Sequence, residues 1–186
     1  MRFFVFVKAK PGRETEVAVK MKSLPNVNRV YLIPREFDLL AEVHYDDASF
    51  VNHKTKISET ILNGIRSLGH VVDTRTIIPI EPTLEKSSNE STGAFALIQT
   101  QPGRANEVLR RLKELLEVKA AHLMFGEADL FLQLQVNITS APQPMIASII
   151  QNEIMSVRWI SDTDTVIPFL EFNCSPQSAQ LGLPAN

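Results

Sequence analysis

The chain has 186 residues, of which 44% are hydrophobic and 22% charged, and its formal net charge is -2. This composition is typical of a globular protein and excludes a disordered or a membrane-embedded chain. The nearly balanced charge gives no overall attraction to nucleic acid or to an anionic membrane, so we expect neither as a partner. The single cysteine, Cys174, excludes an intrachain disulfide, and we expect a reduced, cytoplasmic setting.

The first 80 residues alternate between strand and helix patterns. Residues 2–9 form a short apolar run that ends at Pro11 and Gly12, which indicates a strand buried on both faces. Residues 13–24 place apolar side chains four and three positions apart, which predicts an amphipathic helix. The remaining elements are two strands joined by a hairpin, a second helix and a closing strand, expected at 27–33, 38–45, 48–67 and 71–80.

Basic residues gather around the first predicted helix. They are Lys8, Lys10, Arg13, Lys20 and Lys22. They predict at most a modest basic face, because charges of this kind usually form the solvated flank of a helix.

The same pattern occurs twice in the chain. Residues 2–45 align without a gap to residues 93–136, and 13 of these 44 positions are identical, against roughly 3 for unrelated sequences. Two copies are fewer than an open solenoid needs, so we expect a fused pair. The predicted segments are a first βαββαβ unit at 1–81, a linker at 82–92, a second unit at 93–170 and an irregular tail at 171–186.

Each unit has the element order of the ferredoxin-like fold, in which both helices cover one face of a four-stranded antiparallel sheet. The first strand is apolar on both faces, so the open face of each sheet must also be buried. We predict an α+β protein whose two sheets pack face to face as an intramolecular αβ barrel, a covalent pseudo-dimer. Some polar side chains would then lie inside and need hydrogen-bond partners, from waters or a small ligand: Glu42, His44, Gln133 and Gln135.

Three short motifs recur in both copies. They are the Pro-Gly-Arg turn at 11–13 and 102–104, the hairpin ending in Asp-Leu at 38–39 and 129–130, and the Asp-Thr-x-Thr strand at 73–76 and 162–165. In this order and spacing each copy resembles the effector-binding (RAM) domain of the leucine-responsive regulator/asparagine regulator (Lrp/AsnC) family. The resemblance implies an αβ barrel paired through its sheets and binding of amino acids or related metabolites near subunit interfaces. We expect no cofactor.

Members of that family typically carry a helix-turn-helix ahead of this domain. Here the first strand begins at residue 2, so we expect no DNA-binding module and no direct contact with nucleic acid.

The hairpin departs from the family pattern, Gly-x-aromatic-Asp-Leu, at a different place in each copy. The first copy has Arg35 in place of the glycine, and the second has Ala128 in place of the aromatic residue. This asymmetry favours one functional site, or none, over two equivalent sites. The candidate ligand-binding residues lie in the hairpins and closing strands: Glu36, Phe37, Asp38, Thr74, Gly126, Glu127, Asp129 and Thr163.

The hairpin carboxylates, above all Asp38 and Asp129, are candidates to bind the ammonium group of an amino acid, since a charged acceptor strengthens that hydrogen bond. The alternative is that they are exposed turn acids that keep the hairpins soluble. The hydroxyls of Thr74 and Thr163 are candidates for the ligand carboxylate, although threonine is also a good strand former.

We therefore predict a stand-alone tandem effector-binding module that senses an amino acid or related metabolite, as a homo-oligomer or in an assembly with related regulators. One alternative is an interaction protein that assembles with full-length regulators of that family and binds no ligand. A lesser alternative is a small αβ-barrel enzyme with His44 as its base, although the counterpart of His44 is Gln135. We find no nucleophile with a base and no metal-ligand spacing, so we predict no catalytic residue, no metal site and no enzyme.

Overall fold

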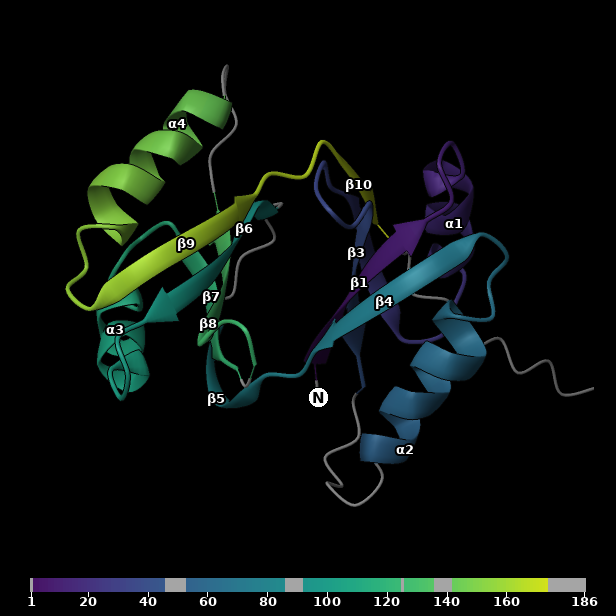
Figure 1. Cartoon of the computed structure of the whole chain (residues 1–186), viewed down its shortest axis with the longest axis horizontal. Helices are drawn as coiled ribbons and strands as arrows, with labels where there is room; N and C mark the ends of the chain where they lie inside the picture. Colours follow the sequence, from purple (N-terminus) through teal and green to yellow (C-terminus); the bar gives the residue numbers. More distant parts are fainter. Residues whose placement is uncertain (1, 46–52, 86–91, 125, 136–141, 174–186) are drawn as a thin grey trace, which may run out of the picture.

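The computed structural model describes residues 2–45, 53–85, 92–124, 126–135 and 142–173. The start of the predicted second helix, most of the predicted linker and tail, and Cys174 lie outside these ranges. Two antiparallel sheets face each other in the middle of the molecule, and the helices lie on their outer sides (Figure 1). No helix in the described ranges is long and apolar enough to cross a membrane.

The first half contains strand β1 (Arg2–Ala9), helix α1 (Glu14–Lys22), strands β2 (Val27–Leu32) and β3 (Leu39–His44), helix α2 (His53–Ser58) with its π-helical continuation η2 (Glu59–Ile65), and strand β4 (Val71–Ile77). Strand β1 is an interior strand that pairs with both β3 and β4, so that Val5 lies opposite Ala41 on one side and Thr76 on the other. The short apolar run at the start of the chain therefore forms an interior strand of a sheet, as its two-sided burial predicts.

The second half repeats this order with β6 (Thr92–Thr100), α3 (Ala105–Leu112), β7 (Val118–Leu123), β8 (Leu130–Gln135), α4 (Pro142–Ile149), η3 (Ile150–Ile154) and β9 (Ile160–Val166). Strand β6 is an interior strand of its sheet, paired with β8 and β9. The predicted α+β class, built from two ferredoxin-like sheets, is confirmed.

The second helix of each half ends in π-helical turns, where the sequence predicts a regular helix. Ile57, Ile61 and Ile65 are spaced four residues apart, and Ile57 and Ile65 are buried in the core beneath the sheet. A π-helical turn, with hydrogen bonds from i to i+5, is wider than the 3.6-residue turn of an α-helix. The wider π-helical turn keeps residues spaced four apart closer to one face than an α-helical turn does. The four-residue spacing of the isoleucines, which predicts a helix, is therefore also compatible with a π-helix.

Each sheet takes its fifth strand from the other half of the chain. Strand β5 (Ile80–Glu85) follows β4 but pairs with β7, and strand β10 (Leu170–Asn173) follows β9 but pairs with β2. The structure thus differs from the predicted four-stranded sheets, because the start of the expected linker and of the expected tail form strands. The open edges of β2 and β7 present unpaired backbone groups, which the passing chain satisfies. The division of the chain into two units with the predicted boundaries stays a prediction.

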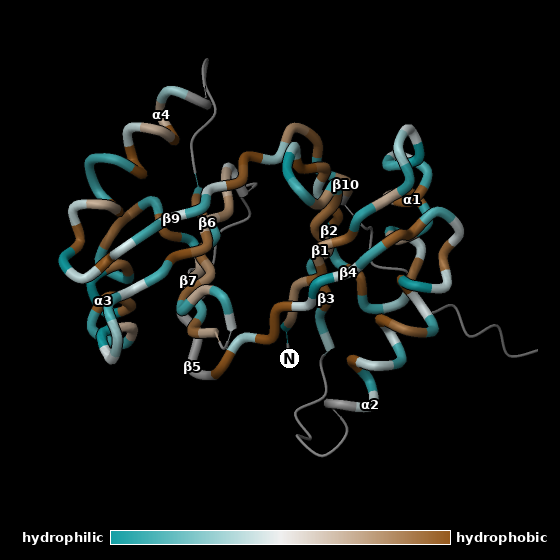
Figure 2. Tube along the Cα trace, in the orientation of Figure 1, coloured by the Kyte–Doolittle hydropathy of each residue, from teal (hydrophilic) through white to brown (hydrophobic). Residues whose placement is uncertain are grey.

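The two sheets are held together by an aromatic core, as the apolar open faces predict. This intersheet core comprises Phe4, Phe6, Tyr31, Ile33, Phe37, Leu40 and Ile77 of the first sheet with Phe95, Phe131 and Val166 of the second. The ring centroids of Phe4 and Phe131 are 4.5 Å apart, and those of Tyr31 and Phe95 are 4.8 Å apart. Figure 2 shows the hydrophobic segments of both sheets toward this shared interior. Each half therefore buries the open face of the other.

Candidate functional site

Asp38 and Asp129 bind the backbone of their own half. Asp38 Oδ2 accepts a hydrogen bond from the Ala9 amide at 2.8 Å, and Asp129 Oδ2 accepts from the Thr100 amide at 2.7 Å and the Thr100 hydroxyl at 2.9 Å. Both amides lie where the pairing register of the central strand shifts. The carboxylate thus binds a backbone N–H at an irregular point of the sheet. A role for either aspartate in ligand binding stays a prediction.

Replacing Asp129 with alanine should lower the free energy of unfolding by about 1–3 kcal/mol, because two donors lose a charged acceptor. Asp38→Ala should cost less, since Asp38 accepts from one donor. Urea unfolding measures both losses, with the exposed neighbour Glu36→Ala as a control within about 0.5 kcal/mol of wild type. An Asp129 variant as stable as the control would contradict this structural role.

Thr74 and Thr163 lie on the helix-covered faces of their sheets. Thr74 pairs opposite Val7 and Thr163 opposite Ile98, and both apolar partners belong to the cores beneath the helices. Residues directly opposite each other share a sheet face. Phe37 belongs instead to the intersheet core, so the structure does not bring the threonines to the side on which Phe37 packs.

One pocket gathers residues of the second hairpin against the last strand of the first half. Its volume is about 240 Å³. We call it the hairpin pocket. The residues that line it are Arg75, Thr76, Ile77, Leu97, Met124, Gly126, Glu127 and Ala128. Gly126 has φ 133°, a conformation that a residue with a side chain rarely adopts. Two of the predicted ligand-binding residues, Gly126 and Glu127, thus line a concave site between the halves.

The hairpin pocket carries one positive and one negative side chain. Arg75 Nη1 lies 3.1 Å from Glu127 Oε2, and the two side chains are 43% and 80% exposed. The guanidinium of Arg75 also lies 5.2 Å from the centroid of the Phe37 ring, which gives it a cation–π contact. Phe37, a predicted ligand-binding residue, therefore acts on this pocket through the position of Arg75.

The first hairpin has larger side chains at the corresponding positions. Phe37 stands where the second copy has Ala128, and its ring packs against Phe6 at a centroid distance of 5.9 Å. The counterpart of Phe6 is Leu97, which lines the hairpin pocket together with Ala128. Two larger aromatic side chains in the first half thus occupy the room that smaller ones leave in the second.

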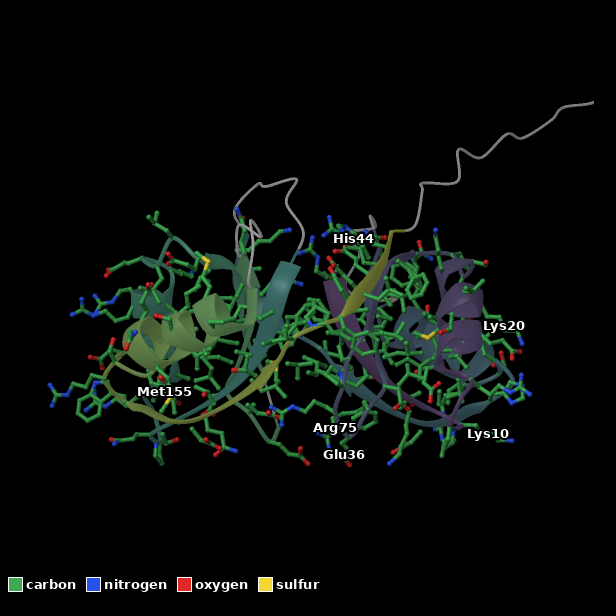
Figure 3. The ribbon with its side chains drawn as sticks, turned by 90° about the horizontal axis from the view of Figure 1, so that it is seen from above. Lys10, Lys20, Glu36, His44, Arg75 and Met155 are labelled. Carbon is green, nitrogen blue, oxygen red and sulfur yellow. The ribbon has the colours of Figure 1, made fainter. Side chains whose placement is uncertain are left out.

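The charges at the two hairpins are also exchanged. Arg35 of the first hairpin pairs with Asp164 of β9 at 3.0 Å, whereas Glu127 of the second hairpin pairs with Arg75 of β4. The first hairpin therefore supplies a cation and the second an anion. Glu36, the remaining hairpin acid of the predicted set, is exposed on the same side of the molecule as Arg75 (Figure 3).

The opposite end of the intersheet space is polar. We call this region the polar end. Its seven residues are Arg2, Arg29, Glu42 and Glu171 of the first sheet and Lys119, His122 and Gln133 of the second. His44, which pairs opposite Arg2, marks this end in Figure 3, and Arg75 lies at the opposite end of the same sheet. Glu42 and Gln133 are 6% and 2% exposed, so the interior position predicted for both is confirmed.

Sequence reasoning missed His122, which is fully buried. Its ring lies 5.5 Å from that of Phe4, across the interface. One signal would have found it: the counterpart of His122 in the first copy is the inward-facing Tyr31.

The polar end contains two ion pairs. Arg2 Nε lies 3.0 Å from Glu42 Oε1, and Arg29 Nη1 lies 3.4 Å from Glu171 Oε1. Both pairs belong to the first sheet. They face a second sheet whose buried polar side chains, His122 and Gln133, are neutral at pH 7.

Burial dominates the ionisation of the groups around these pairs. It raises the pKa of Glu171 and, together with the nearby Arg29 charge, lowers the pKa of Lys119. Burial, and to a lesser extent the charge of Arg2, lowers the pKa of His122 to about 4. The His122 ring is therefore uncharged at neutral pH, with one nitrogen as a donor and the other as an acceptor.

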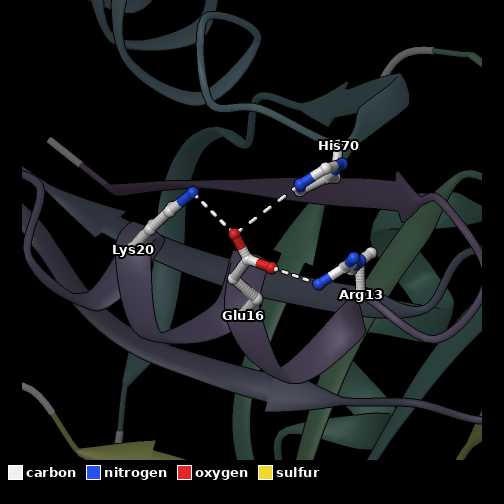
Figure 4. Close-up of polar contacts among 4 residues, drawn as sticks. All are labelled: Arg13, Glu16, Lys20 and His70. Carbon is white, nitrogen blue, oxygen red and sulfur yellow. Dashed lines mark hydrogen bonds and ion pairs between the residues drawn. The ribbon is translucent and has the colours of Figure 1, made fainter.

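Two of the basic residues around the first helix, Arg13 and Lys20, form ion pairs with one acid. Glu16 lies 3.1 Å from Arg13 and 2.8 Å from Lys20, and 3.6 Å from His70 (Figure 4). The hydrogen bond from Lys20 holds the pKa of Glu16 below its usual value. Among the described residues, no group of three His, Cys, Asp or Glu side chains is placed to hold a metal ion.

No family model matches the chain, and no curated protein matches it. Similar solved structures exist. The siroheme decarboxylase NirDL, bound to an iron-uroporphyrin III analogue, covers 93% of this chain and 72% of its own, with 11% identity and a TM-score of 0.60. A protein of Lactobacillus acidophilus NCFM assigned as a monooxygenase covers 91% of this chain and 92% of its own, with 4% identity and a TM-score of 0.57.

Lrp/AsnC-family proteins match a smaller part of the chain. TTHA0845 from Thermus thermophilus covers 44% of this chain and 94% of its own, with 25% identity and a TM-score of 0.38.

The prediction that the chain is not an enzyme is wrong as a flat exclusion. NirDL, an enzyme, shares the architecture over 93% of this chain. At 11% identity this likeness establishes the fold alone, and one fold serves both catalysis and binding. The absence of a nucleophile–base motif in the sequence therefore does not rule out catalysis.

Proposed function

We propose that this protein is a small-molecule-binding module whose ligand is an aliphatic α-amino acid, held in the hairpin pocket. The observation that carries the proposal is the pairing of Arg75 and Glu127 beside an apolar lining. An α-amino acid has one carboxylate for the arginine, one ammonium for the glutamate and one side chain for the apolar lining, which consists of Ile77, Leu97 and Met124.

The energetics favour replacing the Arg75–Glu127 ion pair with contacts from each side chain to the ligand. An exposed ion pair such as Arg75–Glu127 is worth at most about 1 kcal/mol, so separating it costs little. A zwitterion placed between the two side chains replaces that single pair with two charge-assisted hydrogen bonds. The volume of about 240 Å³ suits a ligand smaller than the drug-sized molecules that fill pockets of about 300–1,000 Å³.

The location of the pocket supports a sensing role. Arg75 belongs to the first half and Glu127 to the second, so a ligand that bridges them links the placement of the two halves to its own concentration. The resemblance of both copies to the Lrp/AsnC effector-binding domain supports an amino acid as the ligand class, and a partner protein as the recipient of the signal. The tetrapyrrole analogue bound by NirDL is a property of that enzyme.

Isothermal titration calorimetry with the aliphatic amino acids tests this proposal. Wild-type protein should bind at least one of L-leucine, L-isoleucine, L-valine and L-methionine. Arg75→Gln and Glu127→Gln should each weaken that binding tenfold or more, because each removes one of the two charged contacts. The matched control is Arg35→Gln, which breaks the equivalent ion pair at the first hairpin and should leave the affinity within twofold of wild type.

Two results would overturn the proposal. One is the absence of heat with every amino acid while circular dichroism shows a folded protein. The other is an equal loss of affinity in Arg35→Gln and Glu127→Gln. Recovery of the bound amino acid unchanged after incubation separates binding from turnover.

A further inference from the structure

We propose that the polar end is a second ligand site, which binds a small organic carboxylate through His122 and Gln133. It lies at the opposite end of the intersheet space from the hairpin pocket and does not depend on it. The proposal starts from two side chains of the second sheet that are almost completely buried, His122 at 0% and Gln133 at 2% exposure.

Both side chains have polar atoms without partners. Neither Nδ1 nor Nε2 of His122 has a hydrogen-bond partner, and Nε2 of Gln133 has none either. Native structures pair the large majority of buried polar side-chain atoms, because each such atom left alone loses its hydration without compensation. Unpartnered groups from the neighbouring strands β7 and β8, on the same sheet face, indicate a site that a bound molecule completes.

The available groups favour a negatively charged molecule with acceptor atoms. The amide nitrogen of Gln133 is a donor, and the neutral imidazole of His122 offers one N–H. Three cationic side chains lie at the polar end, together with two acids: Arg2, Arg29 and Lys119 with Glu42 and Glu171. One carboxylate supplies an acceptor oxygen for each of the two donors, and its negative charge is favourable close to these cations.

The surroundings of His122 favour an organic anion over phosphate. The His122 ring lies 5.5 Å from the Phe4 ring and 6.3 Å from the Phe131 ring, so one side of the site is aromatic. A carbon substituent packs favourably on such a wall, whereas a phosphate would bring more charge and more acceptors than the donors can serve.

The arginines of the polar end are more exposed to solvent than the two buried donors. The side chains of Arg2 and Arg29 are 22% and 29% exposed, whereas His122 is not exposed at all. An incoming anion therefore meets positive charge first and the neutral donors afterwards, an order that attracts a carboxylate and then removes it from water.

Nuclear magnetic resonance of the His122 ring tests the proposal directly. The probes are sodium acetate and sodium phenylacetate, titrated at constant ionic strength into protein labelled with ¹⁵N at the histidine rings, and the spectrum of His122→Phe assigns the signal. The His122 nitrogen shifts should change and saturate with either carboxylate. Gln133→Met should weaken the response tenfold or more, and Lys119→Gln several-fold.

The matched control for charge is Lys10→Gln, because Lys10 lies far from the polar end and is exposed (Figure 3). Its affinity for acetate should equal that of wild type. Neutral acetamide and sodium chloride should leave the His122 signal unchanged. A stronger response to inorganic phosphate than to acetate would contradict a carboxylate site, and no response to any anion would show that water alone satisfies these groups.

The two proposed sites can be tested independently of each other. Arg75→Gln should leave the His122 response to acetate intact, and His122→Phe should leave amino-acid binding at the hairpin pocket intact. Loss of both responses in either variant would overturn the claim that the sites are independent.

Discussion

Replacing Phe131 with alanine should lower the free energy of unfolding by about 3–5 kcal/mol. Phe131 is fully buried on β8, and its ring meets Phe4 of the other half at 4.5 Å and Phe95 of its own half at 5.7 Å. Its removal leaves a cavity between the sheets. The helices lie on the outer sides of the sheets, so they cannot move in to fill this cavity. Because the lost contacts join the halves, both halves should lose stability together.

Hydrogen exchange distinguishes shared from separate unfolding. Amides in the central strands β1 and β6 should report the same free energy of opening, and Phe131→Ala should lower both by the same amount. Leu116→Ala is the control, since Leu116 is 85% exposed and its loss should change stability by no more than about 0.5 kcal/mol. A Phe131→Ala protein that loses protection in β6 alone would contradict the interdependence of the halves.

The buried imidazole of His122 should make the protein less stable as the pH falls from about 6.5 to 4. In the unfolded chain this ring takes up a proton near pH 6.5, whereas in the fold its pKa is about 4 because burial, and then the Arg2 charge, disfavour the charged form. Between these values the unfolded state binds more protons, so acid favours unfolding. The contribution lost over this range is about 3 kcal/mol, from about 1.36 kcal/mol per pKa unit.

His122→Phe isolates this contribution. An aromatic residue is compatible with the site, because its counterpart in the first half is Tyr31. Urea unfolding from pH 7.5 to 4 should show a steeper decline for wild type than for the phenylalanine variant, with the two curves parallel above pH 7. The variant should also be the more stable protein at pH 7, since it lacks the unpartnered ring nitrogens. Parallel curves across the whole range would show that His122 titrates normally.

The fold follows from local sequence patterns to a large extent. Alternation of Phe3 and Val5 with Phe4 and Phe6 requires two buried faces, and the repeat supplies the second sheet that buries one of them. The exchange of β5 and β10 between the sheets could not be predicted in this way. Pairing of an edge strand depends on which open edge the chain passes in three dimensions, and four to six residues carry little signal of their own.

The candidate site was only partly predictable, for a related reason. The hairpin residues Gly126 and Glu127 carry a pattern in the sequence, but their partner Arg75 comes from the other half and contacts them only after the sheets pack. The face on which Thr74 lies depends on its register with β1, and the hydrogen bond from the Ala9 amide to Asp38 depends on a register shift in the same strand. The register between strands that are far apart in the sequence produces no periodic pattern in a single sequence, so it cannot be predicted from that sequence.

The number of amino-acid molecules bound per chain tests the central claim, which is one ligand site where the two halves meet. Calorimetric titration of the tightest-binding aliphatic amino acid should give one molecule per chain. Glu127→Gln should weaken this binding tenfold or more, and Arg35→Gln should leave the stoichiometry unchanged and the affinity within twofold of wild type. Two molecules per chain, lost one at a time in the two variants, would show that both hairpins keep equivalent sites and would contradict the claim.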